Sequence, residues 1–212
     1  MTPDRTRTET SAAPDGAACG RLLVLTGAPG SGKTTRCREL AETARAAGLL
    51  VRGLAATVEP GEGGAERWLE DLGSGERRLL GRQAPPEVVA GGGPQWQLND
   101  AALAWSNAIL SDAGPSDLLI VDEVGPVELL HRRGALAGVE RALARPYRLA
   151  VVVVRPWLVP RFLQLFPVPP AEIVDIGAAT VLSAGLADLL RADPANAGTP
   201  RVARAEAPGV GP

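Results

Sequence analysis

Short apolar runs, separated by segments of helical periodicity, make up most of this chain. Three runs have the apolar character of buried strands: residues 21–26, 118–121 and 148–154. Residues 49–56 are predicted as a further strand. Helical spacing follows the first run, where the apolar residues from Cys37 to Ala44 share one face and Gly48 ends the helix. Further helices are predicted at about 100–112, 134–144, 158–165 and 181–191.

The middle of the chain has a different pattern. Two short runs, residues 67–72 and 77–80, flank Gly73-Ser74-Gly75 and predict a β-hairpin inserted over residues 65–82. Residues 59–64 and 81–94 are predicted as loops, because glycine and proline interrupt any periodicity there. Residues 95–98 predict a short edge strand, and residues 173–176 predict the last strand.

Buried strands that alternate with helices predict an α/β doubly wound fold with a mostly parallel sheet. We expect one domain over residues 20–192, because residues 1–19 and 193–212 lack periodicity and have the composition of a disordered leader and tail. Ligands of such a fold bind at the carboxyl ends of the parallel strands.

Composition narrows the classes of function. A net charge of −2 and an isoelectric point near 5.6 argue against a nucleic-acid-binding surface. Two cysteines form neither a disulfide framework nor a metal cluster, and the only histidine, His131, is predicted to be a solvated loop residue. Because no apolar run reaches membrane-spanning length, we expect a cytoplasmic protein without membrane contact.

A glycine-rich loop follows the first predicted strand and fits the pattern G-x-x-x-x-G-K-[ST]. Its glycines allow successive backbone N–H groups to point inward at a helix N-terminus, which is a site for phosphate. Strand, loop and helix occur in the order that the motif requires. The predicted nucleotide-binding residues are Gly27, Ala28, Pro29, Gly30, Ser31, Gly32, Lys33, Thr34 and Thr35.

Three side chains of this loop have predicted roles with a nucleoside triphosphate such as ATP or GTP. Lys33, the only lysine among 22 basic residues, is predicted to contact the β- and γ-phosphates and to act in catalysis. Thr34 is predicted to bind the accompanying Mg²⁺ through its hydroxyl, and Thr35 to donate to the α-phosphate.

A second candidate segment closes the apolar run at 118–121. Asp122 is predicted as the other protein ligand of Mg²⁺, acting through a bound water, and Glu123 as the group that orients the attacking water. Arg155 follows the run at 148–154 and is predicted to neutralise charge on the γ-phosphate, with Arg132 and Arg133 as competitors for that role. An acidic strand end and a surface salt bridge are the ordinary alternatives for these residues.

Other side chains have weaker assignments. Trp68, on the predicted hairpin, is the preferred candidate for stacking on a nucleobase, although most of the four tryptophans are expected to pack in the core or at its edge. Arg77, Arg78 and Arg82 approach the phosphates only if the hairpin folds over the site as a lid; otherwise they are exposed charges.

Two stretches together resemble a known family. The loop at 27–35, and later Ile120-Val121-Asp122-Glu123-Val124-Gly125-Pro126-Val127-Glu128-Leu129, are similar to the THEP-type nucleoside-triphosphatase and nucleotide kinase family of P-loop NTPases. The similarity covers about residues 21–168, and residues 64–75 look like a diverged form of the family's glycine-rich β segment. The family's Thr-x-Glu-Val-Arg stretch is echoed only by Thr57-Val58-Glu59, with no arginine directly after it.

The resemblance implies a RecA-like fold with an additional central strand, and hydrolysis of several nucleoside triphosphates with little base preference. By position it gives Lys33, Thr34, Asp122 and Glu123 the phosphate, Mg²⁺ and water-activating roles. Glu128 matches a second glutamate of the family, without an assigned role.

Hydrolysis of nucleoside triphosphates to the diphosphate and phosphate is therefore the leading prediction. A kinase that transfers the γ-phosphoryl group to a small acceptor would use the same loop and metal ligands. A nucleotide-dependent switch or accessory protein is the third alternative, and no docking motif for a protein partner is evident.

Overall fold

The computed structural model describes residues 20–90, 95–166 and 172–176 of the 212 residues. The predicted leader, the predicted helix at 181–191 and the predicted tail lie outside the described residues.

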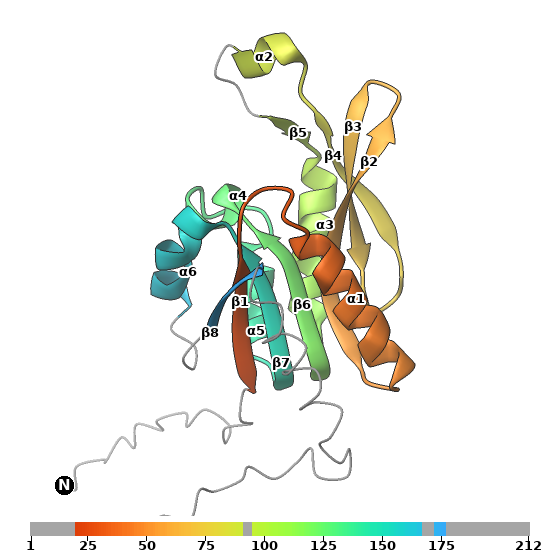
Figure 1. Ribbon diagram of the computed structural model, residues 1–212, viewed down its shortest axis with the longest axis vertical. Helices are drawn as coiled ribbons and strands as arrows, with labels where there is room; N and C mark the ends of the chain where they lie inside the picture. Colours follow the sequence, from red (N-terminus) through yellow and green to blue (C-terminus); the bar gives the residue numbers. More distant parts are fainter. Residues whose placement is uncertain (1–19, 91–94, 167–171, 177–212) are drawn as a thin grey trace, which may run out of the picture.

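One eight-stranded sheet forms the centre of the molecule, in the order β5-β4-β3-β2-β6-β7-β1-β8 (Figure 1). The parallel part consists of β2 (Val51–Gly61), β6 (Ser116–Val124), β7 (Tyr147–Val154), β1 (Arg21–Thr26) and β8 (Glu172–Asp175). The antiparallel part adds β3 (Gly64–Asp71), β4 (Arg77–Gln83) and β5 (Trp96–Leu98) beyond β2.

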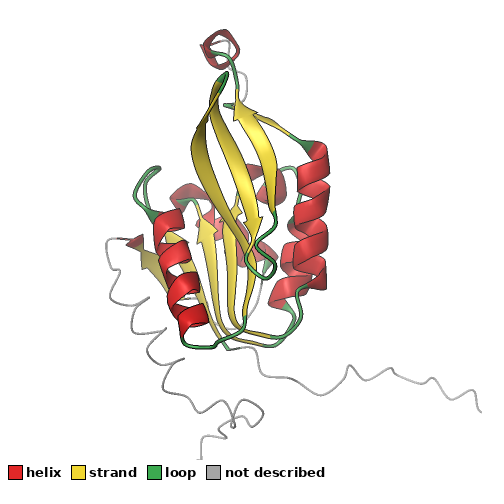
Figure 2. Cartoon of the chain, turned by 90° about the vertical axis from the view of Figure 1, so that its right-hand side faces the viewer, coloured by secondary structure: helices red, strands yellow, loops and turns green. Residues whose placement is uncertain are grey.

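Helices cover both faces of the parallel part, as Figure 2 shows. The long helix α1 (Lys33–Ala46) packs on one face. The opposite face is covered by α3 (Asp100–Asp112), α4 (Pro126–Leu129), α5 (Leu136–Leu143) and α6 (Val159–Leu165). A short helix, α2 (Pro86–Ala90), lies at the far end of the antiparallel part (Figure 1).

The period of two in the strands explains these two layers. In β1, Leu23 and Leu25 pack under α1, while Leu22 and Val24 belong to the core cluster on the opposite face. A strand buried on both faces must be apolar at every position, which is the pattern that predicted it. The predicted α/β doubly wound class is confirmed.

The largest difference from the sequence prediction concerns β2. Its first residues pair with β6, and from Leu54 to Gly61 it pairs with β3, so the predicted loop at 59–64 is wrong except at residues 62–63. This half of β2 is partly exposed and contains Glu59 and Pro60, so no apolar run marks it as a strand. The prediction of a loop at 81–94 is also wrong at its start, where β4 continues to Gln83 and α2 follows.

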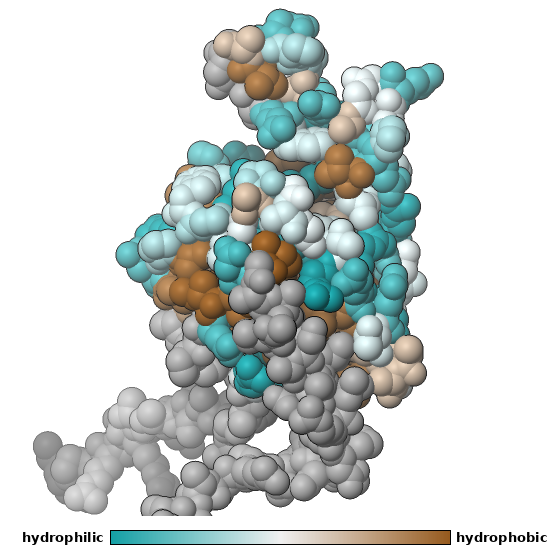
Figure 3. Space-filling model, viewed as in Figure 1, coloured by the Kyte–Doolittle hydropathy of each residue, from teal (hydrophilic) through white to brown (hydrophobic). Residues whose placement is uncertain are grey.

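The length of β2 has a consequence for the site. The strand continues past the point where it leaves β6, and it carries β3, β4 and β5 beyond the carboxyl ends of β6, β7 and β1 (Figure 1). Polar colours dominate the visible surface of this extension, with brown atoms over α2, where Val88 and Val89 are exposed (Figure 3). The extension therefore borders the edge of the sheet at which ligands of this fold class bind.

Candidate nucleotide site

The glycine loop connects β1 to α1 in a conformation that only glycine adopts readily. Gly27, Gly30 and Gly32 have φ angles of 139°, 72° and 89°, and Gly32 is the N-cap residue of α1. A Cβ atom at Gly27 would lie 2.8 Å from the side chain of Ile176. The loop thus directs backbone N–H groups and the positive end of the helix dipole toward the same side.

Lys33 is the first residue of α1, and its side chain turns back over the loop. Its Nζ donates to the backbone oxygens of Gly27, at 2.9 Å, and Ala28, at 2.7 Å. A further bond of 3.3 Å reaches Ser31 Oγ. The ammonium group is therefore held within the loop, at the position predicted for a phosphate contact.

Asp122 lies near the end of β6 and is only 3% exposed. Its carboxylate accepts hydrogen bonds from the Thr34 hydroxyl and from the Ala56 N–H, the latter at 3.3 Å. Burial raises the pKa of Asp122 above its ordinary value, although the two hydrogen bonds and the charge of Arg67 oppose that effect. The fold thus joins Thr34 and Asp122, which are distant in sequence, in a single contact.

Glu123 is held between two guanidinium groups. Arg67, on β3, donates from Nη2 to Oε2 at 3.0 Å, and Arg155, directly after β7, donates from Nε to Oε1 at 2.5 Å. Burial alone would raise the pKa of Glu123, but the charges of Arg67 and then of Arg155 outweigh it and lower the pKa below the ordinary value. Glu123 is therefore ionised at neutral pH and fixed in orientation from two sides.

These oxygen groups fit a magnesium ion. The carboxylate of Asp122 is buried, the hydroxyl of Thr34 lies against it, and among the described residues no cationic side chain pairs with it directly. Mg²⁺ prefers hard oxygen ligands and usually keeps several waters beside one or two protein groups and the phosphates. Within the described residues no cluster of three or more His, Cys, Asp or Glu side chains is present, so a cage made by the protein alone is not formed there.

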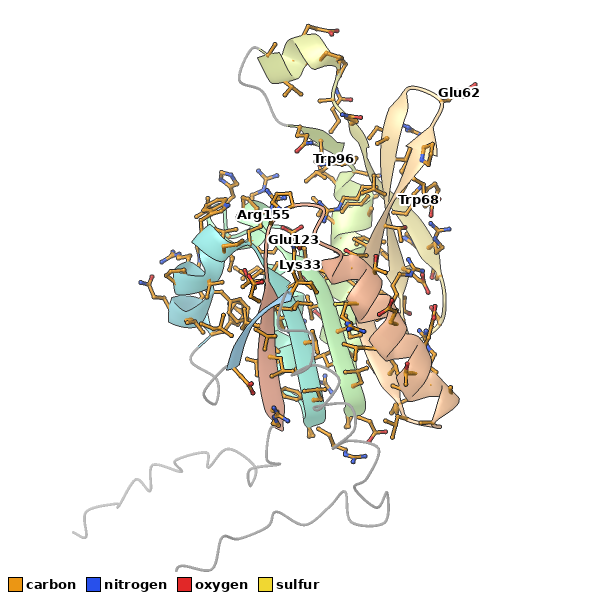
Figure 4. The ribbon with its side chains drawn as sticks, viewed as in Figure 1. Lys33, Glu62, Trp68, Trp96, Glu123 and Arg155 are labelled. Atoms are coloured by element: carbon orange, nitrogen blue, oxygen red, sulfur yellow. The ribbon has the colours of Figure 1, made fainter. Side chains whose placement is uncertain are left out.

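A cavity of about 850 Å³ joins these groups, with the glycine loop on one side and the β2–β5 extension on another. Lys33, Glu123, Arg155 and Trp96 all line it, and Figure 4 shows the first three close together with Trp96 beyond them. Trp157 also lines the cavity and is 60% exposed. The size is that of a site for a small molecule or cofactor.

The aromatic lining differs from the sequence prediction. Trp68 points away from the cavity, on the outer part of β3, with the Arg77 guanidinium 5.4 Å from its ring centre. Trp96 and Trp157 line the cavity instead. Trp68 therefore does not line this cavity, because the face to which a side chain of β3 points depends on a pairing register that the sequence does not show.

The competing arginines and the predicted lid residues also lie elsewhere. Arg132 and Arg133 are exposed and line no part of the cavity. On the extension, Arg77 pairs with Glu59, Arg78 with Glu76, and Arg82 with Glu66. His131 is exposed, as predicted.

Glu128 has a role that the sequence did not reveal. Its carboxylate accepts from the Gly125 N–H at 3.1 Å and from the Ala135 N–H at 3.3 Å, so it joins the start of α4 to the start of α5. Gly134, with a φ of 63°, leaves room for it, since a Cβ atom there would lie 2.5 Å from Glu128 Oε1. Glu128 thus fixes the chain that follows the Asp122-Glu123 pair.

Arg67 is the main site residue that sequence reasoning missed. It is only partly exposed, touches Glu123, and lines the cavity. A signal was present in the sequence, because an arginine between Glu66 and Trp68 on a predicted strand must point to one face of the sheet. Without the register of β3 against β2, that face could not be assigned.

A glycine loop between a parallel strand and a helix, with a buried aspartate against its threonine, defines a P-loop nucleotide-binding protein. The sequence model of one such family, NTPase, matches residues 22–176. The chain belongs to this NTPase family, which makes it a nucleoside-triphosphatase.

Individual relatives agree with this family. The chain is 36% identical over 136 residues to the nucleoside-triphosphatase THEP1 of Methanopyrus kandleri, a match that covers 62% of this chain and 72% of the relative. It is 30% identical over 126 residues to the nucleoside-triphosphatase THEP1 of Hyperthermus butylicus, covering 58% of this chain and 63% of the relative.

Two solved structures have a similar fold. A human cancer-related nucleoside triphosphatase aligns with a TM-score of 0.56 and 21% identity, covering 78% of this chain and 97% of the other. THEP1 from Aquifex aeolicus aligns with a TM-score of 0.53 and 16% identity, covering 80% and 99%. At these identities the likeness supports the fold alone.

Proposed function

We propose that this chain hydrolyses nucleoside triphosphates, ATP and GTP among them, to the diphosphate and phosphate in a Mg²⁺-dependent reaction at the 850 Å³ cavity. The observation that carries the proposal is Glu123, an ionised carboxylate that Arg67 and Arg155 hold in the same cavity as the glycine loop. Nucleotide binding needs only the loop, whereas hydrolysis also needs a group that positions water.

The loop from Gly27 to Thr35 binds the phosphates in this proposal. Backbone N–H groups at the start of α1 donate to the phosphate oxygens, and Lys33 exchanges its bonds to Gly27 and Ala28 for bonds to the β- and γ-phosphates. The charge that develops on the phosphates is thereby stabilised by groups that are already oriented.

Thr34 and Asp122 would hold the magnesium ion, Thr34 directly and Asp122 through water. When bound, the ion supplies charge neutralisation on the β- and γ-phosphates. Burial of the Asp122 carboxylate raises its pKa in the metal-free protein, and a cation beside it would compensate this cost of burial.

Glu123 orients the attacking water by accepting a hydrogen bond from it. Because its pKa is lowered, Glu123 is a weak base, and its contribution is chiefly to hold the water in line with the γ-phosphorus. A loose transition state requires little proton abstraction before the bond to the leaving group breaks, so a weak base is sufficient. Arg155, beside Glu123, would stabilise the transferred phosphoryl group.

We expect only a weak preference among nucleobases, because of the apolar and aromatic side chains in the lining of the cavity. Val58, Trp96 and Trp157 line the cavity and offer apolar and aromatic faces to a nucleobase. Stacking on an aromatic face tolerates every base, because each base has a π-face.

We also propose that β3 and β4 are an insertion, which the sequence predicted over residues 65–82, because the chain leaves the parallel part after β2 and returns to it at β6. A cytoplasmic location and a nucleotide as partner, without nucleic acid or membrane, fit the slightly acidic charge and the buried Cys37 thiol. No helix within the described ranges is long and apolar enough to cross a membrane.

The test is phosphate release from each of the four ribonucleoside triphosphates, with Mg²⁺ or with excess EDTA. We expect turnover of all four within about tenfold of one another, and loss of turnover in EDTA. Lys33→Ala should abolish turnover, whereas Arg141→Ala, an exposed change on α5, should leave it at the parent rate. Equal phosphate release by the parent and Lys33→Ala would contradict the proposal.

A further inference from the structure

A second cavity lies on the other side of Glu123. Its volume is about 260 Å³, and it lies between the antiparallel strands and the layer formed by α3, α4 and α5. Protein interiors contain few voids larger than a water molecule, whereas a cavity of about 150 Å³ with apolar walls already binds benzene. A space of this size therefore suits a molecule of about ten non-hydrogen atoms.

The walls of this second cavity are mostly apolar. Leucine and valine side chains form much of them, and Leu54, Leu69, Leu80, Leu103, Val121 and Val139 come from six different elements. These residues belong to the core cluster of that face or pack against it. An occupant must consequently have an apolar body.

One end of the second cavity is polar, and it is shared with the nucleotide cavity. Arg67, Glu123 and Arg155 line both cavities, as do Asp122, Gln95 and Trp96. Both guanidinium groups already pair with the Glu123 carboxylate, and the buried carboxylates of Asp122 and Glu128 also line the second cavity, so its polar lining disfavours an anion. A neutral polar group that can donate to Glu123, such as a hydroxyl, fits it better than a carboxylate or a phosphate.

We propose that this cavity binds a small, uncharged, mainly apolar alcohol, and that the chain transfers the γ-phosphoryl group to its hydroxyl. The proposal rests on the proposed nucleotide site, because the lining that the two cavities share, Arg67, Glu123 and Arg155, would place the hydroxyl of the acceptor beside the triphosphate. Water takes the position of the hydroxyl when no alcohol is bound, which gives hydrolysis.

The transfer is balanced without another reactant. The alcohol oxygen forms a bond to the γ-phosphorus, and the bond from that phosphorus to the bridging oxygen breaks, leaving its electron pair on the nucleoside diphosphate. The hydroxyl proton passes to the Glu123 carboxylate and from there to solvent. The products are an alkyl phosphate and the diphosphate.

The experiment uses the full chain with Mg²⁺, γ-labelled ATP and a panel of neutral alcohols: butanol, hexanol, cyclohexylmethanol, benzyl alcohol and 2-phenylethanol. Ethylbenzene has the same apolar body as 2-phenylethanol without its hydroxyl. Binding is measured by saturation-transfer NMR, and labelled alkyl phosphate is separated from labelled phosphate. We expect ethylbenzene and at least one alcohol to bind, and only alcohols to be phosphorylated.

Variants locate the effect. Leu103→Trp fills the cavity from α3, and it should reduce probe binding and alkyl phosphate formation at least tenfold while ATP hydrolysis stays within about twofold of the parent. Leu163→Trp, the same change on the outside of α6, should alter none of these. If Leu103→Trp fails to fold, Leu98→Trp is used instead, because Leu98 lines the cavity from β5.

Two outcomes would overturn the inference. One is hydrolysis of ATP by the parent with no probe bound. The other is binding of the panel without any labelled alkyl phosphate. Probe binding by a parent that hydrolyses no nucleotide would instead contradict the proposed function, and the transfer with it.

Discussion

Arg67 links the extension of the sheet to the catalytic glutamate of the proposal. Its bond to Glu123 is 3.0 Å long, and its charge is the strongest of the influences that lower the pKa of that carboxyl. In Arg67→Gln we therefore expect the pKa of Glu123 to rise, so that the acid limb of the pH–rate profile moves to higher pH. The maximal rate should fall by at most about a hundredfold, since a hydrogen bond between charged groups contributes about 1.5–3 kcal/mol.

The measurement is kcat as a function of pH for the parent, Arg67→Gln and Arg82→Gln. Arg82 lies on the neighbouring strand and pairs with Glu66, away from the cavity, so its variant should follow the parent profile. An acid limb that stays in place in Arg67→Gln would show that Arg67 does not control Glu123.

At the residue scale, the sequence predicted what contiguous motifs determine. Lys33 and Thr34 follow the glycine loop directly, and Asp122 and Glu123 follow a buried strand, so chain order alone places them at one edge of the sheet. Arg67 reaches the same site through strand register and Trp96 through a three-residue edge strand. The edge strand at 95–98 was predicted, but the strand register that brings Arg67 and Trp96 to the cavity leaves no local signal, which is why Arg67 was missed and Trp68 was preferred to Trp96.

Glu128 acts at the scale of elements, because it joins α4 to the chain before α5. Replacing it by alanine leaves the N–H groups of Gly125 and Ala135 without this acceptor, and each unsatisfied buried group costs about 1–3 kcal/mol. We expect Glu128→Ala to lower the free energy of unfolding by about 2–6 kcal/mol. Urea denaturation measures this free energy, and Glu140→Ala, on the exposed face of α5, is the control.

An unfolding free energy of Glu128→Ala equal to that of the parent would contradict this structural role. A loss of turnover with unchanged stability would instead place Glu128 among the residues that act on the nucleotide.

Most elements of the parallel part could be predicted because burial on two faces imposes apolar runs. The second half of β2 could not, because it is covered on only part of its surface and its pairing with β3 comes from backbone hydrogen bonds that any residue makes. Helix α3 was predictable for another reason: Asn99 accepts from the N–H groups of Ala101 and Ala102, a capping signal that lies within the sequence itself.

For the whole molecule, the buried charge of Asp122 couples stability to pH and to metal. Its pKa is raised in the folded state, so folding favours the proton, and the metal-free protein gains stability as pH falls through that raised pKa toward the lower pKa of the unfolded chain. Above it, the ionised carboxylate destabilises the fold. We expect Asp122→Asn to raise the melting temperature of the metal-free protein at neutral pH, and the difference to shrink as pH is lowered.

Mg²⁺ with a non-hydrolysable triphosphate should reverse the order of the two proteins. At a hundredfold excess over Kd, a ligand stabilises by about 2.7 kcal/mol, and each kcal/mol shifts the melting temperature of a chain this size by about 2–4 °C. The parent should gain this stabilisation, and Asp122→Asn should lack most of it. The measurement is the melting temperature of the parent, of Asp122→Asn and of Asp112→Asn, an exposed control, with and without the ligands. A metal-free Asp122→Asn that melts below the parent would contradict the destabilising effect of the Asp122 charge.

The central claim is that Glu123 converts a nucleotide-binding loop into a hydrolytic site. Its most direct test is the pair of quantities, nucleotide Kd and single-turnover rate of phosphate release, measured with Mg²⁺ for the parent and Glu123→Gln. We predict a Kd within about threefold of the parent and a rate at least a hundredfold lower, because glutamine keeps the shape of the side chain and loses the charge that accepts from water. Phosphate release by Glu123→Gln at the parent rate would contradict the account.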